Sequence, residues 1–136
     1  MGNDSAELQR LVDAYWKHYE LAIGDRRERL EAENLFWAWE EVDNAVRAPS
    51  PQTFDLLLAL VHGAQDDDAL AYVGAGPFED LINWDGARFV DEIERYARRD
   101  RAFRQALANV RISSNVPATV RDRLAVYIPP LEPSGG

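Results

Sequence analysis

The chain has 136 residues, 46% of them apolar, and its 15 Lys and Arg side chains face 24 Asp and Glu side chains, which gives a net charge of −9. This length and composition predict one globular domain. The absence of cysteine excludes thiol nucleophiles, disulfides and cysteine-based metal sites. The acidic balance disfavours non-specific binding to nucleic acid or to an anionic membrane and favours a basic protein partner.

The expected location follows from two features of the sequence. The first five residues lack the basic and apolar regions of a signal peptide. The longest aliphatic run, residues 56–61, has six residues, whereas a helix needs roughly 20 to cross a bilayer. We therefore expect a soluble, cytoplasmic protein that does not bind membranes.

Helical periodicity dominates the beginning of the chain. Asp4 and Glu7 have the spacing of a capping box and precede apolar residues that recur on one face, which predicts a helix over residues 5–23. Asp25 is expected to cap a second helix over residues 25–46, which ends before a proline-rich break.

Shorter helices are predicted for the rest of the chain. Ser50 with Pro51 has the pattern of a helix N-cap followed by the first turn, Asp100 is expected to cap the helix that follows it, and Pro117 is expected to begin the last helix. Residues 124–128 fit a helix and a strand equally well. The predicted helical segments are residues 50–63, 66–74, 77–82, 86–97, 100–110 and 117–128.

These segments together predict an all-α fold with at least five helices and at most about a tenth of the residues in strands. The architecture is expected to be a compact irregular bundle or a HEAT-like stack of about six to seven short helices. Residues 1–128 are expected to form a single helical domain, and residues 129–136 a flexible Pro/Gly tail.

The most distinctive stretch is Ala-Tyr-Val-Gly-Ala-Gly-Pro-Phe-Glu-Asp-Leu-Ile at residues 71–82. With Phe-Arg-Gln-Ala-Leu at residues 103–107 as a second anchor, it resembles an uncharacterised bacterial family, the domain of unknown function numbered six-eight-six-nine. The resemblance covers residues 54–112. It implies a fold and a bacterial source, and it implies no reaction.

The motif also has a structural interpretation. Gly74 and Gly76 permit a sharp reversal and a close approach of helices, and Pro77 suits a first helical position. Glu79 and Asp80 would then lie at the positive end of the helix dipole. A phosphate-binding loop is disfavoured because a third glycine and a preceding strand are missing. Val at Gly74 or Gly76 should destabilise the fold wherever the native φ is positive.

Other candidates for chemistry have simpler structural interpretations. His18 and His62 lack a histidine or carboxylate at the spacing of a helical metal pair. Residues 66–68, three consecutive aspartates, are typical of a helix start and lack the pattern of a calcium loop. Ser113 and Ser114 have no nearby histidine in the sequence. We therefore predict no catalytic residue, no metal site and no cofactor.

The only basic concentration lies between residues 88 and 104 and contains six arginines. Three pairs in or next to it have helical i, i+4 spacing, which predicts local neutralisation rather than a nucleic-acid groove. The pairs are Arg88 with Glu92, Asp91 with Arg95, and Glu94 with Arg98.

A partner-binding surface is predicted around Trp37, which lies opposite the main apolar stripe of its helix and near Glu40, Glu41 and Asp43. Trp37 is either an exposed interface anchor or is covered by another helix. The leading hypothesis is a non-catalytic protein-binding module, such as an immunity or antitoxin-like factor that masks a basic partner.

Two alternative functions stay open at this point. The first is an enzyme or small-ligand binder that uses Glu79, Asp80 and Asp85 with an arginine from the second half of the chain. The second is a homo-oligomeric structural subunit. A deep polar pocket on which these carboxylates converge would favour the first alternative over a protein-binding surface.

Overall fold

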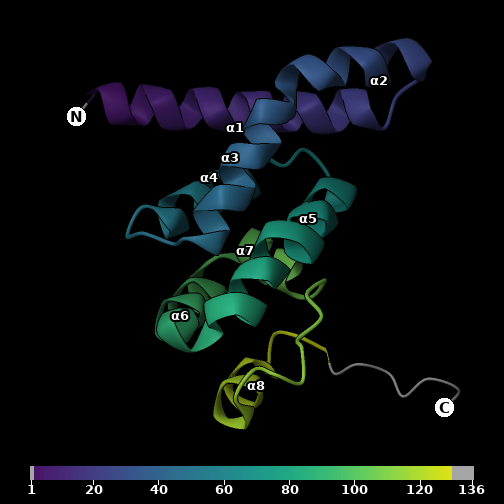
Figure 1. Ribbon diagram of the computed structural model, residues 1–136. Helices are drawn as coiled ribbons and strands as arrows, with labels where there is room; N and C mark the ends of the chain where they lie inside the picture. Colours follow the sequence, from purple (N-terminus) through teal and green to yellow (C-terminus); the bar gives the residue numbers. More distant parts are fainter. Residues whose placement is uncertain (1, 130–136) are drawn as a thin grey trace, which may run out of the picture. The chain divides into compact units, whose positions relative to one another are not determined.

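The computed structural model describes residues 2–129 (Figure 1), and over this range it contains eight α-helices, one 3-10 turn and one π-helical segment but no strand. The all-α prediction is confirmed. None of the helices in this range is both long and apolar enough to cross a membrane. The chain divides into an N-terminal unit, residues 1–64, and a C-terminal unit, residues 65–136.

A single domain over residues 1–128 stays a prediction. In the expected tail of residues 129–136, only Pro129 belongs to the part of the chain that the structure describes.

The N-terminal unit is organised around its first helix. This helix packs against α2, α3 and α4, and Figure 1 shows α2 folding back along it. The elements of the unit are α1 (Gly2–Ala22), α2 (Arg26–Ala32), the 3-10 turn η1 (Glu33–Leu35), α3 (Phe36–Arg47) and α4 (Thr53–Gly63).

Asp25 caps α2 as predicted, through a complete capping box. Its side chain accepts the backbone N–H of Glu28 at 2.9 Å, and the Glu28 side chain accepts the backbone N–H of Asp25 at 3.2 Å. The predicted helix over residues 25–46 is wrong in one respect, because η1 interrupts it. This bend allows both α2 and α3 to pack against α1.

The predicted helix start at Ser50 and Pro51 is a turn that precedes the helix. The backbone N–H of Ser50 donates to Oγ1 of Thr53 at 2.9 Å, and its own Oγ accepts the N–H of Gln52 at 3.2 Å. Helix α4 begins only at Thr53. These side-chain hydrogen bonds therefore stabilise the turn that precedes α4.

Apolar side chains fill the interior of the N-terminal unit. Trp16 is 8% exposed, and its indole Nε1 donates to the carbonyl oxygen of Leu60 at 3.1 Å, which ties α1 to α4. The largest of the other fully buried side chains are Tyr15, Val42, Val46, Leu57 and Leu60.

The C-terminal unit contains one long helical run followed by two shorter helices. Asp66 and Asp100 cap their helices as predicted, accepting the backbone N–H groups of Ala69 at 2.8 Å and Phe103 at 3.0 Å. The elements are α5 (Asp67–Val73), the π-helical segment η2 (Gly74–Phe78), α6 (Glu79–Arg99), α7 (Arg101–Leu107) and α8 (Ala118–Leu124).

The expected chain reversal at Gly74 and Gly76 is wrong. Gly74 is helical (φ −63°, ψ −47°), and α5, η2 and α6 follow one another without a break. A π-helical turn takes up Pro77, which has no N–H to donate inside a helix. Glu79 and Asp80 consequently do not lie at a free helix N-terminus.

Two other boundaries are set within this unit. The predicted break before Gly86 is present as a kink, because Asp85 has non-helical angles (φ −151°, ψ 41°) within α6. Helix α8 begins after Pro117 as predicted and ends at Leu124. Residues 125–127 form a turn, so the segment from 124 to 128 is neither helix nor strand beyond Leu124.

The interior of the C-terminal unit joins the π-helical segment to α6 and α7. The rings of Phe78 and Phe103 lie 4.9 Å apart between centroids, and both are almost fully buried. The largest of the other fully buried side chains are Leu81, Ile82, Ile93, Leu107 and Leu124.

Candidate functional site

A hollow of about 490 Å³ lies between α1 and α3 in the N-terminal unit. Trp37 lines it and is 36% exposed. The guanidinium carbon of Arg10 lies 5.9 Å from the centroid of the Trp37 ring, which is the distance of a cation–π contact. The residues that line the hollow are Glu7, Arg10, Leu11, Trp37 and Glu41. We call the hollow that these residues line the Trp37 hollow.

Helical spacing places these side chains together. Glu7, Arg10 and Leu11 are three and four residues apart on α1, and Trp37 and Glu41 are four residues apart on α3, so each set shares one helix face. The two faces give the hollow an aromatic and aliphatic surface with one carboxylate from each helix. Such a surface is suited to a ligand group that is both flat and cationic.

The structure brings together only part of the predicted partner-binding surface. Trp37 and Glu41 line the hollow, and Glu40 is exposed on the same helix. Asp43 is largely covered and accepts Nε of Arg47 at 2.9 Å, so its carboxylate is used within α3. Of the two predicted states, Trp37 has the exposed one, although its exposed fraction of 36% leaves much of the indole covered.

The α1 side of the hollow was not predicted from the sequence. Leu11 belongs to the apolar face of its helix and therefore looks like a core residue, although it is only half-buried. The available signal was the spacing of Glu7, Arg10 and Leu11, which puts opposite charges beside an apolar residue on one face.

A second hollow of about 320 Å³ lies elsewhere in the N-terminal unit. His18 and Phe36 meet there with their ring centroids 6.0 Å apart, and Phe36 also stacks on Trp39 at 5.3 Å. Burial lowers the pKa of His18. The lining residues are His18, Ala22, Arg29, Ala32, Glu33 and Phe36.

The glycine–proline motif is built into the C-terminal unit as a packing element. A Cβ atom at Gly74 would lie 1.9 Å from the carbonyl oxygen of Ala106, whereas a Cβ at Gly76 would meet nothing within 4 Å. Pro77 is buried. The predicted close approach is therefore present at Gly74 and absent at Gly76.

The carboxylate of Glu79 holds a loop in place by a hydrogen bond to its backbone. Its Oε1 accepts the backbone N–H of Arg111 at 2.7 Å. The nearby Asn83 side chain donates to the carbonyl oxygen of Arg111 at 3.0 Å and accepts the N–H of Ser113 at 2.8 Å. Asp80 is exposed on the following position of α6.

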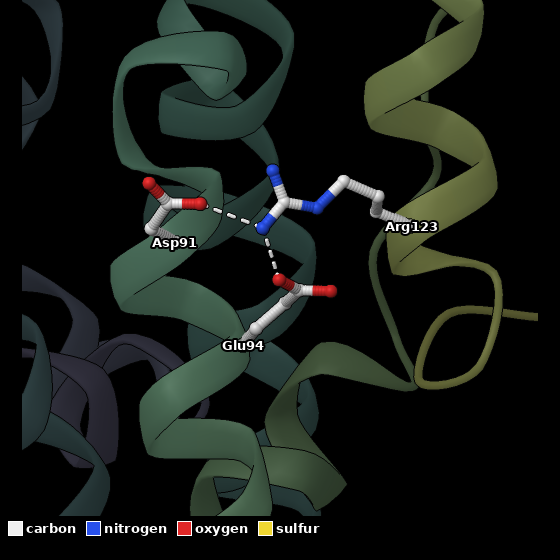
Figure 2. A network of polar contacts seen from close by, with 3 residues as sticks. All are labelled: Asp91, Glu94 and Arg123. Carbon is white, nitrogen blue, oxygen red and sulfur yellow. Dashed lines mark hydrogen bonds and ion pairs between the residues drawn. The ribbon is translucent and has the colours of Figure 1, made fainter.

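Arg123 of α8 links two carboxylates of α6, as Figure 2 shows. Its Nη2 donates to Oδ1 of Asp91 at 2.6 Å and also binds Oε1 of Glu94. The hydrogen bond from Arg123 lowers the pKa of Glu94. The hydrogen bonds to Glu94 and Asp91 raise the pKa of Arg123. The hydrogen-bonded partner of Asp91 and Glu94 is thus a cation from another helix, although the charge of Arg98 on α6 also helps to lower the pKa of Glu94.

The other acidic candidates also have structural partners. Asp85 lies at the kink, 3.8 Å from the guanidinium of Arg88, and Oδ1 of Asp67 accepts Nε2 of Gln105 at 2.6 Å. Within residues 2–129, no group of three or more His, Cys, Asp or Glu residues could hold a metal ion. Neither of the two hollows described above is lined by Glu79, Asp80 or Asp85.

A family model matches residues 25–127, which is most of the chain. The chain belongs to DUF6869, a family of unknown function. No curated protein and no solved structure matches it. The DUF6869 match begins at the capping residue of α2 and includes Trp37 and Glu41, while the α1 side of the Trp37 hollow precedes it. It extends beyond the segment of residues 54–112 on which the sequence resemblance was based.

Proposed function

We propose that this chain is a non-catalytic protein-binding module whose Trp37 hollow holds a basic segment of another protein. The observation that carries the proposal is the half-exposed Trp37 between two helix faces, each of which supplies a carboxylate. Tryptophan is among the side chains most often found as an interface anchor. Carboxylates beside an aromatic face favour a cationic partner group over a neutral or anionic one.

The charge of the N-terminal unit supports the same partner chemistry. Residues 1–64 contain six Lys and Arg side chains and twelve Asp and Glu side chains. A field of this sign speeds the encounter with a basic protein and makes that encounter sensitive to salt. Binding at the hollow would therefore combine a specific aromatic contact with long-range attraction.

A factor that masks a basic protein, such as an immunity or antitoxin-like protein, is the role that we assign to such a surface. The proposal includes a cytoplasmic location, and the absence of cysteine fits such a reducing compartment. A basic protein encoded next to this chain is the natural full-length partner to test.

The direct test uses a fluorescently labelled peptide with alternating basic and small residues, and its fluorescence anisotropy as the chain is added. We expect the basic peptide to bind and an acidic peptide of the same length to stay free. Trp37→Ala should weaken binding by about 2 kcal/mol or more, which is roughly thirtyfold. Glu41→Gln should weaken it by a smaller factor.

A matched control separates the hollow from general acidity. Glu20→Gln removes the same charge from α1 at an exposed position where Glu20 pairs with Lys17 at 3.9 Å, outside the hollow. We expect this variant to bind almost as well as the parent. Binding that is insensitive to Trp37→Ala, or that falls equally in Glu20→Gln and Glu41→Gln, would contradict the proposal.

A further inference from the structure

The surface of Trp37 that lines the hollow is already paired with a cation of the chain itself. Arg10 is exposed, and its guanidinium carbon lies 5.9 Å from the Trp37 centroid, within the same hollow as Glu7 and Glu41. The chain thus places a guanidinium against an indole, with a carboxylate on each of the two adjoining helices. This arrangement indicates that the hollow is complementary to a guanidinium group.

We propose that the Trp37 hollow selects an arginine side chain of the partner, and that Arg10 is an internal placeholder which the incoming arginine displaces. This inference rests on the proposed function, and it specifies the chemistry of the anchoring group. Binding exchanges one guanidinium for another on the indole, so the cation–π contact is kept. The arginine of the partner also gains contacts with the carboxylates of Glu7 and Glu41.

Arginine fits this hollow better than lysine for geometrical reasons. A guanidinium is planar and can stack on an indole while its edge donates several hydrogen bonds to carboxylates. An ammonium group is a compact, strongly hydrated charge, so it makes the ring contact less readily. The carboxylates of Glu7 and Glu41 line the hollow from different helices, so we expect them to meet different edges of one guanidinium.

Displacement of Arg10 is physically inexpensive because its contact is weak and exposed. An exposed cation–π contact contributes little, and its loss corresponds to an affinity factor on the order of threefold. Once displaced, the long Arg10 side chain can turn into solvent from its surface position on α1. Arg10 therefore acts as a competitor that lowers the affinity of weak cationic ligands.

The test follows the indole N–H signals of the chain in ¹⁵N-correlated NMR spectra. The chain has four tryptophans, and a Trp37→Phe variant identifies the signal of Trp37. Two short neutral-ended peptides are titrated, identical except for one central arginine or one central lysine. We expect the arginine peptide to move the Trp37 signal at concentrations at least several-fold lower than those that the lysine peptide requires.

The placeholder role is tested with a matched pair of variants on α1. Arg10→Gln and Lys17→Gln remove the same charge, but Lys17 pairs with Glu20 and does not line the hollow. Arg10→Gln should raise the affinity for the arginine peptide on the order of threefold above that of Lys17→Gln. Equal effects of the two substitutions would overturn the placeholder role.

The outcomes distinguish this inference from the function on which it rests. Equal binding of the two peptides, with both dependent on Trp37, would overturn arginine selection and leave the basic-segment module intact. If neither peptide moves the Trp37 signal, and the longer basic peptide also fails to bind in a Trp37-dependent way, then both proposals are wrong. Arginine-selective movement of the Trp37 signal supports both.

Discussion

Polar side chains serve different purposes in the two units of this chain. In the N-terminal unit, several ion pairs and many of the hydrogen bonds join side chains no more than four residues apart, as in Gln9 with Asp13 and Arg47 with Asp43. In the C-terminal unit, side chains link positions 28 to 38 residues apart, as do Asn83 with Arg111 and Gln105 with Asp67. The first unit is held mainly by apolar packing, with the buried bond from Trp16 to Leu60 between two of its helices, and the second has several polar links between its elements.

This difference indicates where a binding surface is available. The carboxylates of Glu79 and Glu94 in the C-terminal unit are engaged in holding a loop or a helix in place. Both hollows described above lie in the N-terminal unit and contain partly exposed aromatic side chains. Polar groups of the C-terminal unit thus hold its elements together, and the recognition that we propose rests on the surface of the N-terminal unit.

The largest expected effect separates two tryptophans of the N-terminal unit. Trp16→Ala should lower the free energy of unfolding by about 3–5 kcal/mol, because it removes a buried indole, its hydrogen bond to Leu60 and its edge contacts with Tyr15 and Tyr19. Trp37→Ala should cost only about 1–2 kcal/mol because its indole is 36% exposed. Chemical denaturation of both variants measures the two values.

The two tryptophans also differ in access to a quencher. Acrylamide should quench the fluorescence of Trp37 more strongly than that of Trp16, as seen by comparing the parent with each Trp→Phe variant. A loss of stability in Trp37→Ala as large as that in Trp16→Ala, with no quencher access, would remove Trp37 from the proposed interface.

The second effect concerns the two glycines of the motif in the C-terminal unit. Gly74→Ala should destabilise by about 2–3 kcal/mol, since its Cβ would overlap the carbonyl oxygen of Ala106 at 1.9 Å. Gly76→Ala has open space and a φ outside the left-handed region, so it should be neutral or stabilising by up to about 1 kcal/mol. Thermal and denaturant unfolding of this pair tests the packing role, and similar results for both would contradict it.

Local signals in the sequence predicted a large part of the fold. Asp25, Asp66 and Asp100 cap helices as expected, because a cap depends on residues only three positions apart. The π-helical segment was not predictable in this way. A Gly-Pro pair is typical of a helix start, and the contact that requires Gly74 comes from Ala106, which is distant in the sequence.

The candidate site was predicted on one side only. Trp37 and Glu41 share a face of one helix, so periodicity was enough to associate them. The α1 face that completes the hollow depends on how α3 meets α1 after the bend at η1, and no local pattern specifies that bend. For the same reason, helical spacing predicts a partner for Glu94 on its own helix, whereas the side chain that binds it, Arg123, belongs to α8.

The third effect compares a long-range polar link with a local one. Asn83→Ala should cost about 1–2 kcal/mol, because it leaves the backbone groups of Arg111 and Ser113 without their bonds to α6. Gln9→Ala removes an exposed bond to Asp13 on the same helix and should cost about 0.5 kcal/mol or less. Denaturant unfolding gives both values.

Hydrogen exchange can locate the change that Asn83→Ala causes. Amides in the loop between α7 and α8 should exchange faster in this variant, while those of the N-terminal unit keep the parent rates. Equal destabilisation by Asn83→Ala and Gln9→Ala would mean that the distance spanned by a polar link does not distinguish the two units.

The smallest expected effect is the pH dependence of the link from Arg123 to α6. The folded-state pKa of Glu94 is lowered from its ordinary value of 4.5, chiefly by the hydrogen bond from Arg123. A lowered carboxyl pKa stabilises the fold above the unfolded-state value, and this contribution is lost as pH falls through the folded-state pKa. Arg123→Gln should therefore lower Tm at pH 7, and its difference from the parent should shrink as pH falls below 4.5.

Glu94→Gln provides the internal control for this pH dependence, since it removes the charge of Glu94 and keeps a similar shape. Its Tm difference from the parent should fade over the same pH range and be smaller when Arg123→Gln is already present. The titration of His18 is common to all these variants and cancels in the differences. Because the pair is at the surface, salt should reduce the effect. A Tm difference that stays constant from pH 7 to pH 3 would show that Arg123 stabilises α8 by packing rather than by its charge.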